Sequence, residues 1–117
     1  YFIILGSLLM VITDLVIDPI AVDGLEIWIW ENPGQYYGIP NHNFYGWFIL
    51  SLPIFYLLSF SKNDIHLISR AVSNLVISFF SIIGIINDII FPSVLGIILV
   101  LVNLYLYIKV KRKENVI

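Results

Sequence analysis

Residues 14–47 read DLVIDPIAVDGLEIWIWENPGQYYGIPNHNFYGW and hold most of the chemically distinctive side chains of the chain. All three tryptophans, five of the eight acidic residues and one of the two histidines fall inside this stretch. The sequence on either side of it consists mainly of Leu, Ile, Val and Phe. A polar, aromatic segment with several Gly and Pro residues, placed between apolar helices, is where a membrane protein positions its chemistry.

The composition of the 117-residue chain is that of a membrane protein. It is 60% hydrophobic and 12% charged, whereas soluble domains are about 25% charged, and its mean hydropathy is +0.97. One core of this size cannot bury so much apolar surface, so lipid must cover part of it. The sequence has no cysteine, which excludes disulfides and thiolate metal sites. Its few basic residues exclude nucleic acid as a partner.

Apolar runs in the sequence predict an all-α, polytopic bundle that forms one transmembrane domain. The four predicted helices cover about residues 2–17, 44–60, 65–86 and 92–108, and the connection 18–43 carries the motifs. The first helix is shorter than the roughly 20 residues of a full span, and the chain begins inside it. We therefore expect the chain to be the C-terminal part of a longer bundle. Small residues of the third helix, among them Ser81 and Gly84, predict close contact with a neighbouring helix.

The positive charges predict how the bundle is oriented in the membrane. The predicted topology brings all six to one side: Lys62, Arg70, Lys109, Lys111, Arg112 and Lys113. Because Lys and Arg are enriched on the cytoplasmic side, we predict a multi-pass protein of the cell membrane with a cytoplasmic C-terminus. The basic tail is expected to contact anionic lipids, and Arg70 to extend its charge to the membrane surface. Asn74 and Asn103 are expected to bond to each other between helices.

Asp14 and Asp18 are the candidate catalytic residues. Their four-residue spacing places both carboxyl groups on one face of the first helix, and an ionisable group within an apolar span is costly and therefore a functional candidate. Asp18 is predicted at the C-terminal end of the helix, where its charge opposes the helix dipole. Burial and mutual repulsion favour one protonated carboxyl at neutral pH, which suits a general acid. The structural alternative has Asp14 bonded to a neighbouring helix and Asp18 solvated in a turn.

The candidate substrate-binding residues are Trp28, Trp30, Tyr37, Asn43 and Trp47. Their aromatic members could form a pocket for a conjugated or cationic ligand, or belong to the aromatic belt of a membrane interface. Asn43 could orient a water molecule or cap the second helix. Residues 20–30 are too short to span, and both an interfacial helix and a re-entrant segment remain open. His42 and His66 are predicted at opposite ends of the bundle, so no metal site is expected.

Four short motifs carry a resemblance to a known family. They are Asp14-x-x-x-Asp18-Pro19, Trp28-x-Trp30, Tyr37-Gly38-Ile39-Pro40 and Asn43-Phe44-x-Gly46-Trp47. In order and spacing they resemble carotenoid-biosynthesis membrane proteins, a family that includes bisanhydrobacterioruberin hydratase and the carotenoid 1′,2′-hydratase of the CruF type. The specific resemblance covers residues 14–47, under a third of the chain.

The resemblance implies a hydro-lyase that adds water to a terminal isoprenoid C=C of a membrane-dissolved carotenoid and forms a tertiary alcohol. Such an alkene needs a strong, dry proton donor, and a carboxylate can accept the proton that water releases. Asp14 and Asp18 could divide these roles without a cofactor or metal. The implied partners are the lipid-soluble carotenoid, membrane lipids and other carotenoid-pathway enzymes. The alternatives are another prenyl-lipid enzyme, such as a cyclase or isomerase, and a non-enzymatic subunit that relays protons or ions.

Overall fold

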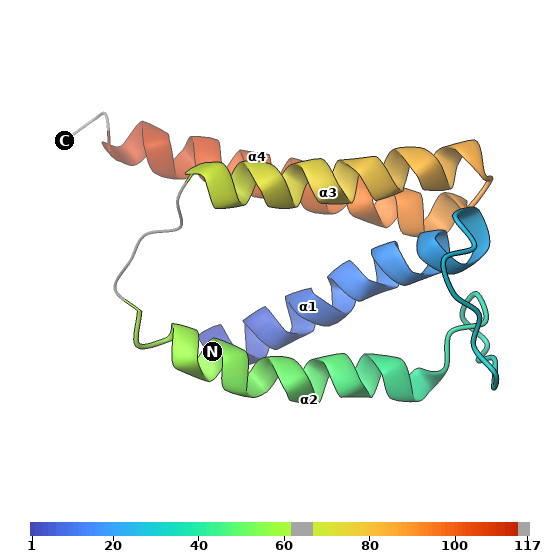
Figure 1. The fold of residues 1–117 in the computed structure, drawn as a ribbon. Coiled ribbons are helices and arrows are strands. Elements are labelled where there is room, and N and C mark those ends of the chain that lie inside the picture. Colours follow the sequence, from blue (N-terminus) through green and yellow to red (C-terminus); the bar gives the residue numbers. More distant parts are fainter. Residues whose placement is uncertain (62–66, 115–117) are drawn as a thin grey trace.

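The computed structural model describes residues 1–61 and 67–114, which form a bundle of helices (Figure 1). Helix α1 covers Phe2–Pro19 and runs without a break into a π-helical turn, η1, at Ile20–Gly24. Helix α2 covers Asn41–Leu58, α3 covers Leu67–Ile86 and α4 covers Ile90–Glu114. The predicted all-α fold with four main helices is therefore confirmed.

The first helix is longer than predicted, because Pro19 does not end it. Proline removes only its own N–H from the helical hydrogen bonds, and the chain beyond it continues with the wider π-helical pattern. Leu25 N–H, for example, donates to Ile20 O at 2.9 Å. Asp18 consequently lies inside a helix, and its predicted place at the helix end is wrong.

The boundaries of the connection, of α2 and of α4 also differ from the predicted ones. The connection covers residues 25–40, not 18–43, and α2 begins at Asn41, three residues before its predicted start. Residues 20–30 do not form a single helix: Ile20–Gly24 extend α1, and residues 25–30 have no regular secondary structure. At the other terminus α4 continues to Glu114, so the basic residues that were predicted to form a tail lie on a helix.

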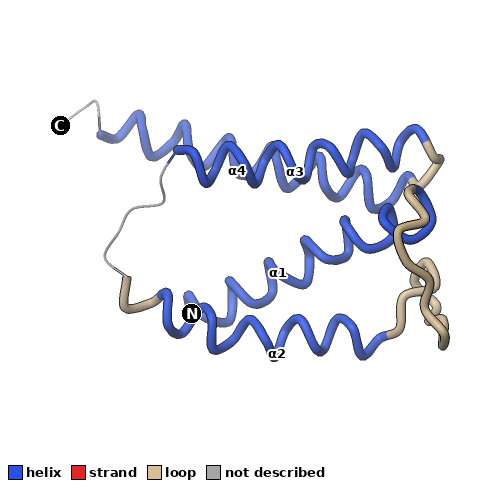
Figure 2. The backbone as a smooth tube through the Cα atoms, in the orientation of Figure 1, coloured by secondary structure: helices blue, strands red, loops and turns tan. Residues whose placement is uncertain are grey.

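Helix α1 is the centre of the arrangement. It packs along α2 on one side, and its C-terminal part together with η1 contacts the α3–α4 hairpin. Successive helices run in opposite directions, as predicted (Figure 2). The connection 25–40 and the α3–α4 turn therefore share one end of the bundle, while the N-terminus and the last turns of α4 lie at the other.

Three segments of the described chain are long and apolar enough to cross a membrane: Phe2–Gly24, Ile68–Ile86 and Ile90–Arg112. The first segment is therefore long enough to span a membrane, although the sequence predicted a helix that was too short to do so. Helix α2 was also predicted to span, but it does not meet the same criterion, and its first turn carries three polar residues in succession, Asn41, His42 and Asn43.

At the end of the bundle that holds the basic residues, the side-chain contacts differ from those predicted. Arg70 does not simply extend to the surface: its Nη1 donates to Asn103 Oδ1 at 3.2 Å, and its guanidinium lies 5.4 Å from the Tyr107 ring centroid. Asn103 is thus bonded to Arg70 and not to Asn74, whose buried Oδ1 has no partner among the described residues. Lys62 and His66, and the side chain of Lys113, lie outside the described residues.

Small residues bring α3 and α4 close together, as predicted from Ser81 and Gly84. A Cβ atom at Gly84 would overlap the hydroxyl of Ser93 on α4, and a Cβ atom at Gly96 on α4 would overlap the hydroxyl of Ser81. Helix α1 and η1 cover these contacts, because Ile20 of η1 would lie 2.9 Å from the Cβ position at Gly84 and Val16 of α1 would lie 2.9 Å from that at Gly96. Val16, Ile20 and Ile89 form the buried core at this junction.

We expect Gly96→Ala to destabilise the protein, because the added methyl group would overlap Ser81 and crowd Val16. Overpacking of this kind costs about 1–3 kcal/mol. Gly46→Ala is the matched control: Gly46 is also helical, but a Cβ there meets nothing within 4 Å. Thermal unfolding in detergent should give a lower Tm for Gly96→Ala and an unchanged or higher Tm for Gly46→Ala, and equal losses would contradict close packing at Gly96.

Candidate functional site

Asp14 and Asp18 are buried between α1 and the first turn of α2. Their side chains are only 8% and 5% exposed, although most of the large apolar residues of the chain are exposed. Both residues belong to α1, and their spacing of four brings them to the same helix face. The alternative that Asp18 is a solvated turn residue is therefore wrong.

Asn43 joins the two carboxylates. Its Nδ2 donates to Asp14 Oδ2 at 2.8 Å and to Asp18 Oδ2 at 2.7 Å, so these two oxygens are at most 5.5 Å apart, the sum of the two bonds. A primary amide nitrogen carries two hydrogens, and one nitrogen can therefore serve both carboxylates. The predicted role of Asn43 as a helix cap is wrong, because Pro40 is the N-cap of α2.

The carboxylate pair is held by hydrogen bonds rather than by opposite charge. Among the side chains described for residues 1–61 and 68–112, no basic group forms an ion pair with Asp14 or Asp18. The same part of the chain contains no cluster of three His, Cys, Asp or Glu side chains able to hold a metal ion. Two acidic groups thus share a buried site in which a neutral amide is their common donor.

Tyr36 ties the connection to α1 next to Asp14. Pro19 has no N–H, so the carbonyl of Leu15, four residues earlier, lacks its usual helical donor. The Tyr36 hydroxyl donates to Leu15 O at 2.8 Å and replaces that missing bond. Burial, and secondarily the neighbouring Tyr37, raise the pKa of Tyr36 to about 12, so its hydroxyl remains protonated at neutral pH. The sequence interpretation missed this role, although a proline inside a helix signals an unpaired carbonyl four residues earlier.

A tight turn positions the Tyr36 side chain. Ile39 N–H donates to Tyr36 O at 2.8 Å, and the two residues between them have positive φ, 47° at Tyr37 and 72° at Gly38. This is the pattern of a type I′ turn, in which Gly is favoured. The Tyr36 ring also meets Phe44 edge-on, with centroids 5.9 Å apart. The connection is therefore fixed against both α1 and α2 at the carboxylate site.

We expect Tyr36→Phe to lower the free energy of unfolding by about 0.5–1.5 kcal/mol, the usual net value of one hydrogen bond. Tyr45→Phe is the control, because Tyr45 is exposed.

The raised pKa of Tyr36 also predicts a pH dependence of stability. The stabilisation linked to the protonated hydroxyl is complete below pH 10, the ordinary pKa of tyrosine, and is lost as the pH rises towards 12. Unfolding measured across this range should show that loss in the wild type but not in Tyr36→Phe. Equal free energies of unfolding for Tyr36→Phe and Tyr45→Phe would contradict the stabilising role of the Tyr36 hydrogen bond.

Asn43 also lines an open pocket of about 330 Å³ on one face of α2, together with His42, Gly46, Trp47 and Leu50. Residues 43, 46, 47 and 50 recur at the spacing of one helix face. The pocket is mostly apolar, and Asn43 is the residue that it shares with the carboxylate pair.

The remaining candidate substrate-binding residues lie apart from one another. Trp30 meets His42 edge-on with centroids 6.1 Å apart, and its buried Nε1 has no partner within the described ranges. Tyr37 packs against the buried core, and Trp28 is 39% exposed on the connection. The structure thus brings Asn43 and Trp47 to one pocket and places Trp30 beside it through His42, while Tyr37 and Trp28 occupy other positions.

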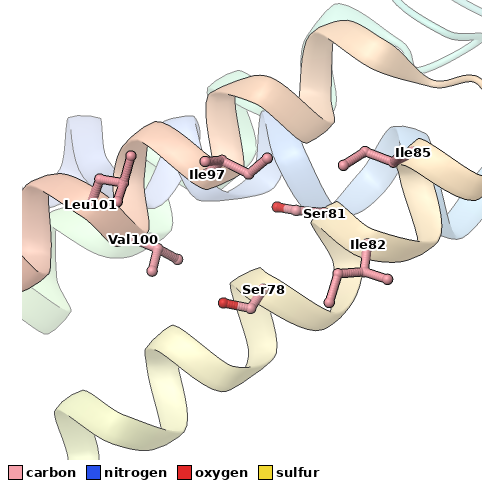
Figure 3. Close-up of a pocket in the computed structure, with 7 residues that line it drawn as sticks. All are labelled: Ser78, Ser81, Ile82, Ile85, Ile97, Val100 and Leu101. Carbon is pink, nitrogen blue, oxygen red and sulfur yellow. The ribbon is translucent and has the colours of Figure 1, made fainter.

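Figure 3 shows a second pocket, of about 200 Å³, between α3 and α4. Its lining is apolar except for the hydroxyls of Ser78 and Ser81, and Ser81 Oγ donates to Ile77 O at 2.8 Å. Because none of its lining side chains titrates, this pocket offers no acid or base. The carboxylate site is therefore the candidate for catalysis.

Comparison with known proteins identifies the family of the chain. A family model described as carotenoid biosynthesis protein matches residues 1–103, a range that includes both carboxylates, Asn43 and the 14–47 motifs. Searches of curated proteins and of solved structures gave no match. The chain therefore belongs to the carotenoid biosynthesis protein family, and its role lies in carotenoid biosynthesis.

Proposed function

We propose that the protein is a hydratase that adds water to a terminal isoprenoid double bond of a membrane-dissolved carotenoid and yields a tertiary alcohol. The observation that supports this most is the buried pair Asp14 and Asp18, bridged by one Asn43 nitrogen at 2.8 and 2.7 Å. Hydration of an alkene needs a proton donor and a proton acceptor. Two neighbouring carboxyl groups can supply both when one is protonated and the other ionised.

The proposed reaction begins when one carboxyl gives its proton to the less substituted carbon of the double bond. The π electrons form the new C–H bond and leave a tertiary cation at the branched carbon. A water oxygen then bonds to that carbon, and the proton that this water loses passes to the other carboxylate. The pair holds one proton before and after the reaction, and transfer of that proton between Asp14 and Asp18 restores the starting state.

The pocket on α2 supports a route for the substrate to the carboxylates. Its walls include Trp47 and Leu50, and Asn43 contributes to both the pocket and the pair. An apolar wall suits the end of an isoprenoid chain, and an aromatic face such as that of Trp47 stabilises a nearby cation. We assign Trp47 to substrate binding and Asn43 to positioning of the two carboxylates.

The product distinguishes the proposed hydratase from its alternatives. Membranes containing the protein would be incubated with a carotenoid that has a terminal isoprenoid double bond, and the product analysed by mass spectrometry. A mass gain of one water that is absent from membranes without the protein supports the hydratase. A product of unchanged mass would instead indicate a cyclase or isomerase. No product, together with proton flux in liposomes that Asp14→Asn abolishes, would indicate a proton relay.

A further inference from the structure

Two cations converge on one aromatic ring at the end of the bundle opposite the carboxylates. The Arg70 guanidinium lies 5.4 Å and Lys111 Nζ lies 5.9 Å from the centroid of Tyr107. Each cation gains from the ring, but the two like charges repel each other. No acidic side chain of the described chain pairs with either of them. The site therefore has a positive charge that an anion would offset.

A pocket of about 210 Å³ includes one of these cations, Arg70, and its lining residues carry several hydrogen-bond donors. It is lined by Ser69, Arg70, Ser73 and Asn103. Asn103 accepts the Arg70 bond through Oδ1, which leaves its Nδ2 hydrogens for another acceptor. The remaining guanidinium N–H groups and the Ser69 hydroxyl are further donors. An oxyanion with several acceptor oxygens is the ligand that such a donor set favours, and Arg binds phosphate oxygens especially well.

We infer that this pocket binds the phosphate group of an anionic phospholipid. It lies between two segments with the length and hydropathy of membrane spans, Ile68–Ile86 and Ile90–Arg112. Apolar side chains exposed on the same turns, including Ile68, Val72 and Leu106, can contact the acyl chains. A free phosphate ion would gain nothing from this apolar surface, so the surroundings favour a lipid as the source of the phosphate. This inference is independent of the proposed hydratase activity.

The test compares binding of short-chain phosphatidylglycerol, phosphatidylcholine and inorganic phosphate to the purified protein in neutral detergent. Phosphatidylglycerol should bind about tenfold or more tightly than the other two. Arg70→Gln should weaken its binding by at least about tenfold, as loss of a charged hydrogen bond predicts. Lys111→Gln should weaken it more than Lys109→Gln, because Lys109 carries the same charge on the same exposed helix end but has no contact with the Tyr107 ring among the described residues.

Three results would overturn the inference. Equal losses for Lys111→Gln and Lys109→Gln would show that only net charge matters. Inorganic phosphate binding as tightly as phosphatidylglycerol would show a site for free anions, and equal binding of phosphatidylcholine would show that lipid charge is not recognised. The two lysine variants alter exposed side chains of one helix end, so their comparison remains decisive even if Arg70→Gln fails to fold.

Discussion

Asp14→Asn and Asp18→Asn should each lower the rate of carotenoid hydration by about 10²- to 10⁴-fold, the range of general acid–base catalysis. Asparagine has nearly the same shape as aspartate, but its amide neither delivers nor accepts the proton that the proposed reaction transfers. Because both side chains are buried at one site, loss of either interrupts the same transfer. The measurement is the rate of alcohol formation per amount of protein in membranes.

Asp23→Asn provides the matched control for these substitutions. Asp23 lies in the π-helical turn that continues the same helix, but its side chain is exposed. This variant should retain close to wild-type activity, and all three proteins should accumulate in membranes at similar levels. Wild-type rates in either the Asp14 or the Asp18 variant would remove that residue from the proposed mechanism.

Asn43→Leu should lower both activity and stability. Leucine has a similar size but no amide, so Asp14 and Asp18 would lose their common donor while remaining buried. Each buried group left without its partner costs about 1–3 kcal/mol, and both carboxyl groups of the pair would lose their partner. We expect a clearly lower Tm, together with a loss of hydration of about 10²-fold or more because the pair is no longer positioned.

A second substitution separates the structural effect of Asn43 from its effect on the reaction. Adding Asp18→Asn to Asn43→Leu replaces one of the two buried carboxyl groups with a neutral amide that can donate to Asp14, so the Tm should recover in part, while hydration should not. Asn41→Leu is the control, because Asn41 is an exposed residue in the same turn of α2. If Asn43→Leu melted at the same temperature as Asn41→Leu, the bridging role of Asn43 would be wrong.

The parts of the fold that depend on local pattern could be predicted from the sequence. Long apolar runs indicated the helices, and the small residues Ser81 and Gly84 indicated a close helix contact. The end of the first helix could not be predicted in the same way, because Pro19 usually stops a helix and only the hydrogen bonds of η1 carry the chain past it.

The acidic residues of the candidate site could be predicted from the sequence, but their hydrogen-bond partner could not. The cost of an ionisable group in an apolar span identified Asp14, and its four-residue spacing identified Asp18. Asn43 lies 29 residues from Asp14 in sequence, and its bond forms only because α2 packs along α1. The bond from Arg70 to Asn103 likewise joins residues 33 apart. Such pairs depend on tertiary packing, which periodicity and composition do not specify.

The most direct test of the account is to run the reaction in deuterium oxide enriched in heavy oxygen. The account predicts that the wild-type product carries one solvent oxygen on the branched carbon and one deuterium on the adjacent carbon, and that the Asp14→Asn, Asp18→Asn double variant forms no such product. A wild-type product without solvent oxygen, or labelled alcohol formed equally by the double variant, would contradict hydration by this carboxylate pair.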